Sequence, residues 1–340
     1  MDSKLFTPEK IGPLTLRNRT IRAAAFEGMC PGNAPSEMLL DYHRSVAAGG
    51  VGMTTLAYAS VTRSGLSFPH QLWLRPEMAR AFGKAVRLAR EAGFDAVEVH
   101  VGHGYLISQF LSPYTNHRKD EYGGSLENRM RFMRMVMAEV MEAAGNDMAV
   151  LVKMNMRDGF NGGMEIPETL EVAETLQRDG AHALVLSGGF VSRAPMYVMC
   201  GAMPIRSMIW YMKEWWLKIG VRMFGRMMIP AESFREAYFL NDALIFRKEL
   251  KLPLVYLGGL VAREIIDEVL DDGFEFVAMG RALLNEPDFV NRMKKDEKAR
   301  CACEHANYCI ARMYSREMAC HQHMSDLPSC LKKELEKMKK

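Results

Sequence analysis

Residues 96–131 read AVEVHVGHGYLISQFLSPYTNHRKDEYGGSLENRMR. The valine-rich run at 96–101 is short and apolar, which is typical of a buried strand, and histidines stand at its end and just beyond it. Polar residues and glycines follow, and the periodicity of the next segment predicts a helix over 126–144. The stretch therefore predicts a buried strand, a polar loop at its carboxyl end and a helix, in that order.

The same alternation of strand and helix continues in both directions along the chain. Six more strands are predicted, at residues 20–25, 51–58, 149–155, 183–187, 254–257 and 276–279. Five more helices are predicted, at residues 36–48, 76–92, 167–178, 234–249 and 262–271. Continuous apolar strands separated by helices indicate a parallel sheet that is covered on both faces.

Polar residues and glycines stand at the carboxyl ends of many predicted strands: Glu27, His100, Lys153, Ser187, Gly258 and Arg281. Barrel enzymes place their chemistry at that rim, and no G-x-G-x-x-G motif follows the first strand to favour a dinucleotide-binding sheet. We therefore predict an α/β fold, a TIM-type (β/α) barrel. Seven strands are recognisable rather than eight, because the chain between residues 51 and 96 has room for a single helix. The barrel is expected to lack one strand–helix unit.

The composition indicates a globular protein with a sizeable core. The chain has 340 residues, 49% apolar and 25% charged, which excludes a disordered chain, a fibrous repeat and a small disulfide scaffold. A net charge of +3 gives no electrostatic reason to expect a nucleic acid as partner. Residues 1–10 lack the apolar core of a signal peptide, and no apolar run approaches the roughly 18–20 residues that span a bilayer. We expect a cytoplasmic protein whose seven cysteines are free, catalytic or metal-bound.

Three side chains after the strand at 96–101 suit a catalytic pocket. His100, His103 and Tyr105 are close enough in sequence to line one site. Imidazole N–H groups can hold a carbonyl or nitro oxygen, and a phenol can deliver a proton. The alternative interpretation is that one of the two histidines is a structural residue whose hydrogen bonds are satisfied within the core.

The segment 100–131 closely resembles the signature of the old yellow enzyme family, which includes flavin-dependent ene-reductases and proteins like 2,4-dienoyl-CoA reductase. Residues 5–20, LFTPEKIGPLTLRNRT, and residues 276–292, FVAMGRALLNEPDFVNR, also resemble that family. The resemblance covers most of residues 1–295, which we predict to form the FMN-binding barrel. It implies an FMN-dependent NAD(P)H oxidoreductase that reduces activated C=C bonds of α,β-unsaturated carbonyl compounds.

The resemblance also implies roles for individual residues. His100 and His103 match the pair that polarises the substrate carbonyl, and Tyr105 matches the proton donor to the α-carbon. The hydride would come from N5 of the reduced flavin. Lys153 matches a basic residue near the N1/O2 edge of the flavin, where a cation stabilises the anionic reduced form.

Two further groups of residues match the flavin seat of the family. The residues matching the phosphate-binding rim are Gly258, Gly259, Gly280 and Arg281; glycines let backbone N–H groups approach a phosphate, and an arginine can pair with it. Ala24, Ala25 and Ala57 match small residues that pack against the isoalloxazine ring. Their alternative interpretation is that they are ordinary small core residues.

The chain departs from the family pattern near residues 80–81. There, the helix that follows the second strand runs directly into the one that should follow the third, so one strand, its glutamine and a loop over the flavin are missing. An unclosed parallel barrel exposes two strand edges. An alternative function follows from this deletion, namely a flavin-deficient, inactive relative.

The stretch 196–230 is an insertion rich in methionine, with Trp210, Trp215 and Trp216 and interleaved basic residues. Methionine suits irregular apolar surfaces. We expect a lid or a packing surface between subunits of a homo-oligomer. The alternatives are a hydrophobic substrate wall or an interfacial patch that touches a membrane, which would make the chain a barrel that binds an apolar ligand or a membrane surface.

Residues 296–340 form a tail that contains cysteines and histidines. Relatives with an iron–sulfur cluster use four cysteines in a similar place, and Cys303, Cys309 and Cys320 match three of them, whereas Ala306 occupies a fourth. An iron–sulfur cluster or a zinc ion on these thiolates is one interpretation. Uncoordinated cysteines on a C-terminal tail are the other.

Overall fold

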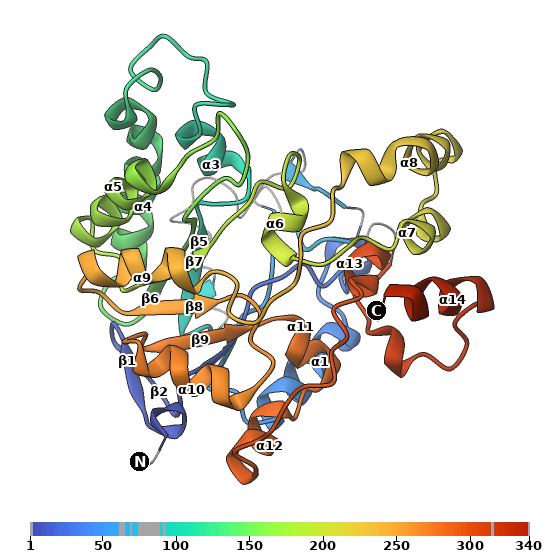
Figure 1. Cartoon of the computed structure of the whole chain (residues 1–340). Helices are drawn as coiled ribbons and strands as arrows, with labels where there is room; N and C mark the ends of the chain where they lie inside the picture. Colours follow the sequence, from blue (N-terminus) through green and yellow to red (C-terminus); the bar gives the residue numbers. More distant parts are fainter. Residues whose placement is uncertain are drawn as a thin grey trace.

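The computed structural model describes residues 3–60, 65–68, 70–73, 89–90, 93–313 and 316–338. Its centre is a seven-stranded sheet in which every neighbouring pair is parallel, in the order β4-β3-β9-β8-β7-β6-β5 (Figure 1). The strands are β3 (Thr20–Arg22), β4 (Met53–Thr54), β5 (Ala96–His100), β6 (Ala149–Asn155), β7 (Ala183–Ser187), β8 (Leu254–Leu257) and β9 (Phe276–Met279). Each lies within or coincides with a predicted strand.

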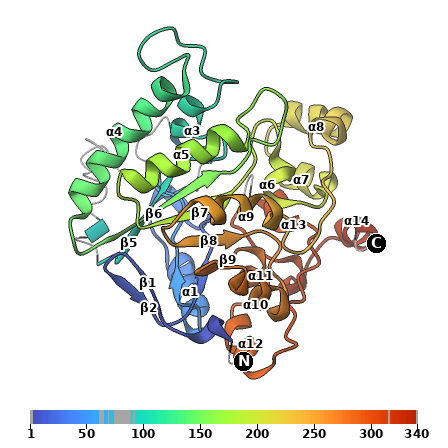
Figure 2. The same cartoon turned by 60° about the vertical axis from the view of Figure 1, so that its left-hand side comes forward.

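The sheet curls into a barrel that is open on one side (Figure 2). Its two edges are β4 and β5, which in the described part of the chain pair only with β3 and β6, respectively. Among the described residues no other strand of this sheet lies between these two along the chain, so the opening is where a strand between them would complete the circle. The prediction of a barrel with seven strands is therefore confirmed. The predicted helix at 76–92, apart from Ala89 and Arg90, and the junction near 80–81 lie outside the described residues.

The helices that follow the strands pack on the outside of the sheet. They are α1 (Glu37–Ala48), α4 (Leu126–Ala144), α5 (Ile166–Arg178), α9 (Leu240–Glu249) and α10 (Arg263–Asp271). The hydroxyl oxygens of Ser36 and Ser125 accept from the backbone N–H groups of Leu39 and Asn128, which satisfies a donor at the start of α1 and of α4. Figures 1 and 2 both show α4 and α5 side by side along one flank of the sheet.

The interior of the half-barrel is filled by residues that alternate along the strands. Ala149 and Leu151 of β6 belong to an inner apolar cluster with residues of β3, β7, β8 and β9. The hairpin of β1 (Glu9–Ile11) and β2 (Leu14–Leu16) adds Ile11 and Leu16 to this cluster. Because side chains alternate with a period of two, the next inward-facing residue of β6 is Lys153, near the carboxyl end.

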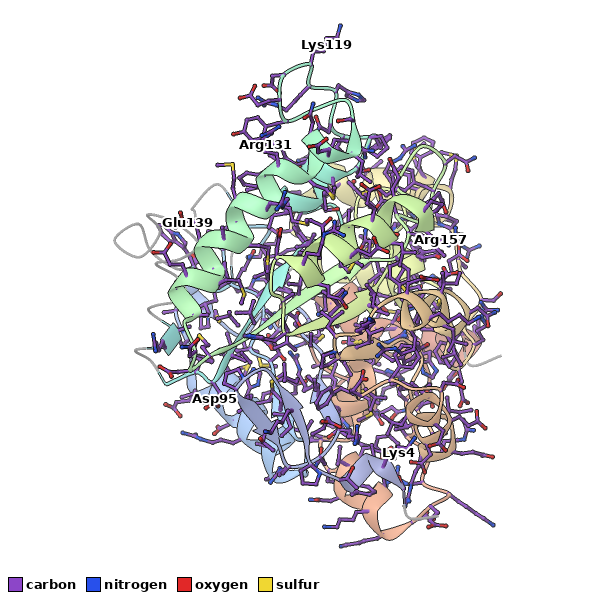
Figure 3. All side chains as sticks on the ribbon, turned by 90° about the vertical axis from the view of Figure 1, so that its left-hand side faces the viewer. Lys4, Asp95, Lys119, Arg131, Glu139 and Arg157 are labelled. Carbon is purple, nitrogen blue, oxygen red and sulfur yellow. The ribbon has the colours of Figure 1, made fainter. Side chains whose placement is uncertain are left out.

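The chain between α3 (Leu106–Leu111) and α4 forms a projecting loop. Figure 3 shows Lys119 at the tip of this loop, far from Asp95, which directly precedes β5. Asn116 holds the loop through its side-chain N–H groups, which donate to the carbonyls of Phe110 and Tyr122 (2.6 and 2.7 Å).

The insertion and the tail pack against each other. The insertion forms α6 (Pro195–Met199), α7 (Ile205–Tyr211) and α8 (Trp215–Met228). After β9 come α11 (Arg281–Asn285) and α12 (Phe289–Lys295), and the tail forms α13 (Tyr308–Arg312) and α14 (Ser329–Met338). Glu334 of α14 accepts from the backbone N–H groups of Arg206 and Ser207 at the start of α7, both at 2.8 Å. Carboxylates are favourable at a helix N-terminus. Within the described ranges, no helix combines the length and the apolar character needed to cross a membrane.

Candidate active site

A cavity lies at the carboxyl ends of β3, β6, β7, β8 and β9, the rim at which barrel enzymes have their active sites. Eight of the residues predicted for the site line it: Ala24, Ala25, His103, Lys153, Gly258, Gly259, Gly280 and Arg281. His100 and Tyr105 adjoin it through contacts with His103 and with each other. The eleventh, Ala57, does not line the cavity, and its backbone N–H donates to the Glu27 carboxylate (3.2 Å).

The two histidines form a fixed pair. His100 Nε2 lies 3.1 Å from His103 Nδ1, so one ring donates to the other. His103 Nε2 lies 2.8 Å from the Ser187 hydroxyl, and the His103 backbone N–H donates to Asn155 Oδ1 (3.0 Å). The sequence at the end of β5 thus places both imidazoles over the ends of β6 and β7.

Both imidazoles are held neutral. Burial, with the Lys153 ammonium adding to it, lowers the pKa of His103 to about 3. Burial, followed by His103 and Lys153, also lowers the pKa of His100 well below its usual value. Neutral imidazoles can donate an N–H to an oxygen without placing a charge in the site.

The pH dependence of stability should report this neutral state. Below about pH 6.5 the unfolded chain protonates the His103 imidazole, whereas the folded protein does so only near pH 3. The free energy of unfolding is therefore expected to fall as the pH drops, by about 2 kcal/mol from His103 alone between pH 7 and pH 5. Urea unfolding at both pH values, with His103→Asn for comparison, measures this, and an unchanged difference in the variant would contradict it.

Tyr105 lies beside the histidine pair. Its ring centroid is 4.9 Å from that of His100, and its hydroxyl donates to the hydroxyl of Tyr58 at 3.0 Å. Tyr58 follows β4 and was not predicted as a site residue. The contact therefore joins the two edges of the open barrel at the level of the site.

Lys153 is a buried cation of the site. Its ammonium lies 2.9 Å from Glu98 Oε1 and donates to the Ala24 carbonyl (3.2 Å); the side chains of Lys153 and Glu98 are 4% and 10% exposed. Glu98 was missed by the sequence reasoning, although it precedes His100 by two residues and so shares its face of β5. A carboxylate at this distance fixes the position of the ammonium.

The rim formed by β8, β9 and α11 is rich in glycine. Gly258 and Gly259 have φ angles of +126° and +70°, which strain any other residue, and a Cβ added at Gly280 would meet no atom within 4 Å. Arg281 donates to Asn307 Oδ1 (2.6 Å) and to the Met199 carbonyl. Its guanidinium thus lies in the cavity wall while it ties the tail to the insertion.

The donor set of the cavity fits FMN, the cofactor that the family resemblance implies. Lys153 and Arg281 supply positive charge, and the small residues Ala24 and Ala25 line one wall. Gly258, Gly259 and Gly280 also line the cavity, and Gly280 has open space beside its Cα. The cavity holds about 160 Å³, whereas small-molecule sites start at roughly 300 Å³. A bound FMN would therefore need more space than this cavity now offers.

The three predicted metal ligands of the tail line one cavity but are not grouped closely enough to form a metal site. Cys303, Cys309 and Cys320 line a second, smaller cavity that shares Arg281 with the first. Burial raises the pKa of Cys309 to about 12, so this thiol keeps its proton at neutral pH. In the part of the chain that the structure describes, no three His, Cys, Asp or Glu side chains are grouped so that they could hold a metal ion. The metal site stays a prediction.

Comparison with known proteins identifies the family of this chain. The model of the NADH:flavin oxidoreductase / NADH oxidase family matches residues 76–191. A 4,4'-dithiodibutanoate disulfide reductase of Rhodococcus erythropolis is 34% identical over 376 residues, covering 92% of this chain and 93% of that protein. An NADPH dehydrogenase of Bacillus subtilis is 39% identical over 220 residues, covering 64% of this chain and 54% of that protein. The solved old yellow enzyme homologue from Zymomonas mobilis has a TM-score of 0.65 at 19% identity, covering 96% of this chain and 99% of that one, which shows the fold alone.

The relatives differ in length from this chain. It spans about half the length, or less, of several other curated relatives that it matches. The alignment with the Rhodococcus protein extends over 376 positions against the 340 residues of this chain, so that relative has stretches with no counterpart here, as expected for a barrel that lacks a unit. The identity to that relative over nearly its full length, together with the family match, shows that this chain belongs to the NADH:flavin oxidoreductase / NADH oxidase family, the old yellow enzyme family, whose members use FMN with NAD(P)H.

Proposed function

We propose that this FMN-dependent oxidoreductase reduces the activated C=C bond of α,β-unsaturated carbonyl compounds. The observation that carries the proposal is the convergence of two neutral imidazoles, a phenol and a buried ammonium at one rim of the barrel: His100, His103, Tyr105 and Lys153. Such a set can hold a carbonyl oxygen, deliver a proton and balance negative charge within a single site.

Each residue has a definite task in this proposal. Each histidine donates one N–H to the substrate carbonyl oxygen, and these hydrogen bonds strengthen as negative charge grows on that oxygen. The hydrogen bond between His100 and His103 opens when the oxygen binds, because two neutral imidazoles joined to each other have only one further N–H between them. Ser187, which now bonds His103, gives up that contact when the oxygen arrives. FMN, when bound and reduced, supplies the hydride to the β-carbon from its N5. Tyr105 gives its hydroxyl proton to the α-carbon.

The positive groups then hold the cofactor. Lys153 is assigned to the N1/O2 edge of the flavin, where its ammonium offsets negative charge. The backbone at Gly258, Gly259 and Gly280, together with Arg281, is assigned to the phosphate. Arg281 must exchange its contact with Asn307 for one with the phosphate.

A spectrum of the purified protein, followed by two anaerobic additions, tests the proposal. The protein is expected to show flavin absorbance, to lose it on addition of NAD(P)H, and to regain it on addition of 2-cyclohexenone with formation of cyclohexanone. A folded, colourless protein that takes up no added FMN would instead favour the flavin-deficient relative. Flavin that is reduced by NAD(P)H but not reoxidised by enones would contradict the substrate class.

A second substrate class is favoured by the Rhodococcus relative, which is named as a disulfide reductase and is 34% identical over 93% of its length. The same residues would serve an organic disulfide, because Tyr105 could protonate the departing thiolate. Addition of 4,4'-dithiodibutanoate to the anaerobically reduced enzyme tests this. Faster reoxidation than with any enone would identify a disulfide reductase.

A further inference from the structure

Helix α8 presents an apolar face to solvent. Its sequence is WWLKIGVRMFGRMM, and within these 14 residues only Gly225 is buried. Trp215, Met223 and Met227 are 72%, 68% and 75% exposed, and the spacing of four between Trp215, Ile219, Met223 and Met227 places them in one stripe along the helix. Monomeric soluble proteins rarely leave a contiguous surface of this kind uncovered.

The inner side of α8 explains how the helix is held. Gly225 approaches Ile205 of α7 so closely that an added Cβ would lie 3.1 Å from it, so the helix is seated on α7 along the Val221–Gly225 side. Val221 and Gly225 lie on the opposite side of the helix from Ile219 and Met223. The apolar stripe therefore points away from the body of the protein. Figures 1 and 2 show α7, α8 and α14 grouped at the periphery, away from α4 and α5.

Basic residues border this stripe. Lys218, Arg222 and Arg226 follow one another at a spacing of four beside it, and α8 contains no acidic residue. Arg222 and Arg226 are exposed. An apolar helix face with tryptophans at one end and cations along one border is the pattern of a helix that lies in the plane of a membrane surface.

We propose that α8 docks this protein on a bilayer that contains anionic phospholipids. The apolar stripe enters the boundary between headgroups and acyl chains, and the cations bind the lipid phosphates. A second copy of the chain is a poorer occupant, because a symmetric contact through α8 would bring Arg222 and Arg226 of both copies together without carboxylates to meet them. A lid over the active site does not use this face, since it points outward.

Vesicle flotation of the FMN-loaded protein tests the proposal. We expect the protein to float with phosphatidylcholine vesicles that contain phosphatidylglycerol, to bind pure phosphatidylcholine much more weakly, and to dissociate at high salt. Three of the four tryptophans lie in the insertion, at 210, 215 and 216, so a blue shift of the fluorescence should accompany binding.

Matched substitutions locate the surface. Arg222→Gln/Arg226→Gln should weaken binding about 30-fold, at roughly fivefold per charge removed, and Met223→Ser/Met227→Ser should weaken it about tenfold or more. Met135→Ser on the exposed face of α4 and Lys294→Gln on α12 are the controls and should change nothing. All four variants should keep the circular dichroism spectrum and the NAD(P)H-dependent activity of the unmodified protein.

Three results would overturn the proposal. One is the absence of flotation with either kind of vesicle. Another is binding of equal strength to neutral and anionic vesicles, with no loss of binding in the Arg222→Gln/Arg226→Gln variant. The third is a dimer in light scattering that Met223→Ser/Met227→Ser dissociates, because the occupant of the stripe would then be a second copy.

Discussion

Tyr105→Phe is expected to slow reoxidation of the reduced enzyme by 2-cyclohexenone by about 10²–10⁴-fold, the range for loss of a general acid. Reduction by NAD(P)H should stay nearly unchanged, because it needs no proton from this hydroxyl. Phenylalanine keeps the ring contact with His100 (4.9 Å between centroids) and removes the hydroxyl, and with it both the proton that Tyr105 would give to the α-carbon and the hydrogen bond to Tyr58. Stopped-flow absorbance at the flavin band measures the two half-reactions separately.

Tyr58→Phe is the matched control for this experiment. The Tyr58 hydroxyl accepts a hydrogen bond from Tyr105 (3.0 Å), so the variant removes the partner and leaves the donor. Its effect on reoxidation should be smaller than that of Tyr105→Phe. Equal losses in both half-reactions for Tyr105→Phe would mean that Tyr105 shapes the site and is not the proton donor.

The strands that the sequence predicts best are those buried on both sides. The predicted boundaries of β6, β7, β8 and β9 are the observed ones, since a continuous apolar run is what a central parallel strand requires. The predicted strand at 51–58 shortens to Met53–Thr54. This strand lies at the edge of the open barrel and, among the described residues, pairs only with β3, over two residues. The local sequence pattern cannot show where this pairing ends, because that depends on the neighbouring strand.

Two features of the helices depend on contacts with distant parts of the chain: where α9 begins, and how α14 is buried. The helix predicted at 234–249 begins at Leu240, because Ala237 has a φ of +46° and Phe234 stacks on His305 of the tail at 3.6 Å. The sequence of residues 329–340 predicts a solvated helical end or a basic tail, whereas α14 buries Leu331 and Leu335 in an apolar cluster with Tyr308 and Leu327 of the tail. Neither contact leaves a signal in the local sequence.

The partners of the site residues were harder to predict than the residues themselves. His100, His103 and Lys153 stand at strand ends, where parallel strands bring side chains together, and β5 and β6 pair His100 with Lys153. Glu98 looks like an ordinary polar position in an alternating strand, and Asn307 reaches Arg281 from the tail. The contact of Glu98 with Lys153 depends on the register of β5 and β6, and the contact of Asn307 with Arg281 depends on how the tail packs.

Lys153→Met is expected to lower the free energy of unfolding by about 3–5 kcal/mol. The side chains of Lys153 and Glu98 are 4% and 10% exposed and lie 2.9 Å apart, so removal of the ammonium leaves a nearly buried carboxylate without its cation. Breaking a buried pair from one side costs more than removing both charges, because the remaining charge is uncompensated. Urea unfolding at pH 7, with FMN in excess, measures the change.

Lys153→Met/Glu98→Gln separates the structural contribution of the pair from its contribution to the flavin. Removing both charges should restore most of the lost stability, because no unpaired ion remains. The flavin reduction potential should be lower than that of the unmodified protein in both variants, since a cation at Lys153 is what would stabilise the anionic reduced form. A double variant as unstable as Lys153→Met would show that Glu98 is not the source of the loss. A double variant that regains the original potential would remove Lys153 from the flavin edge.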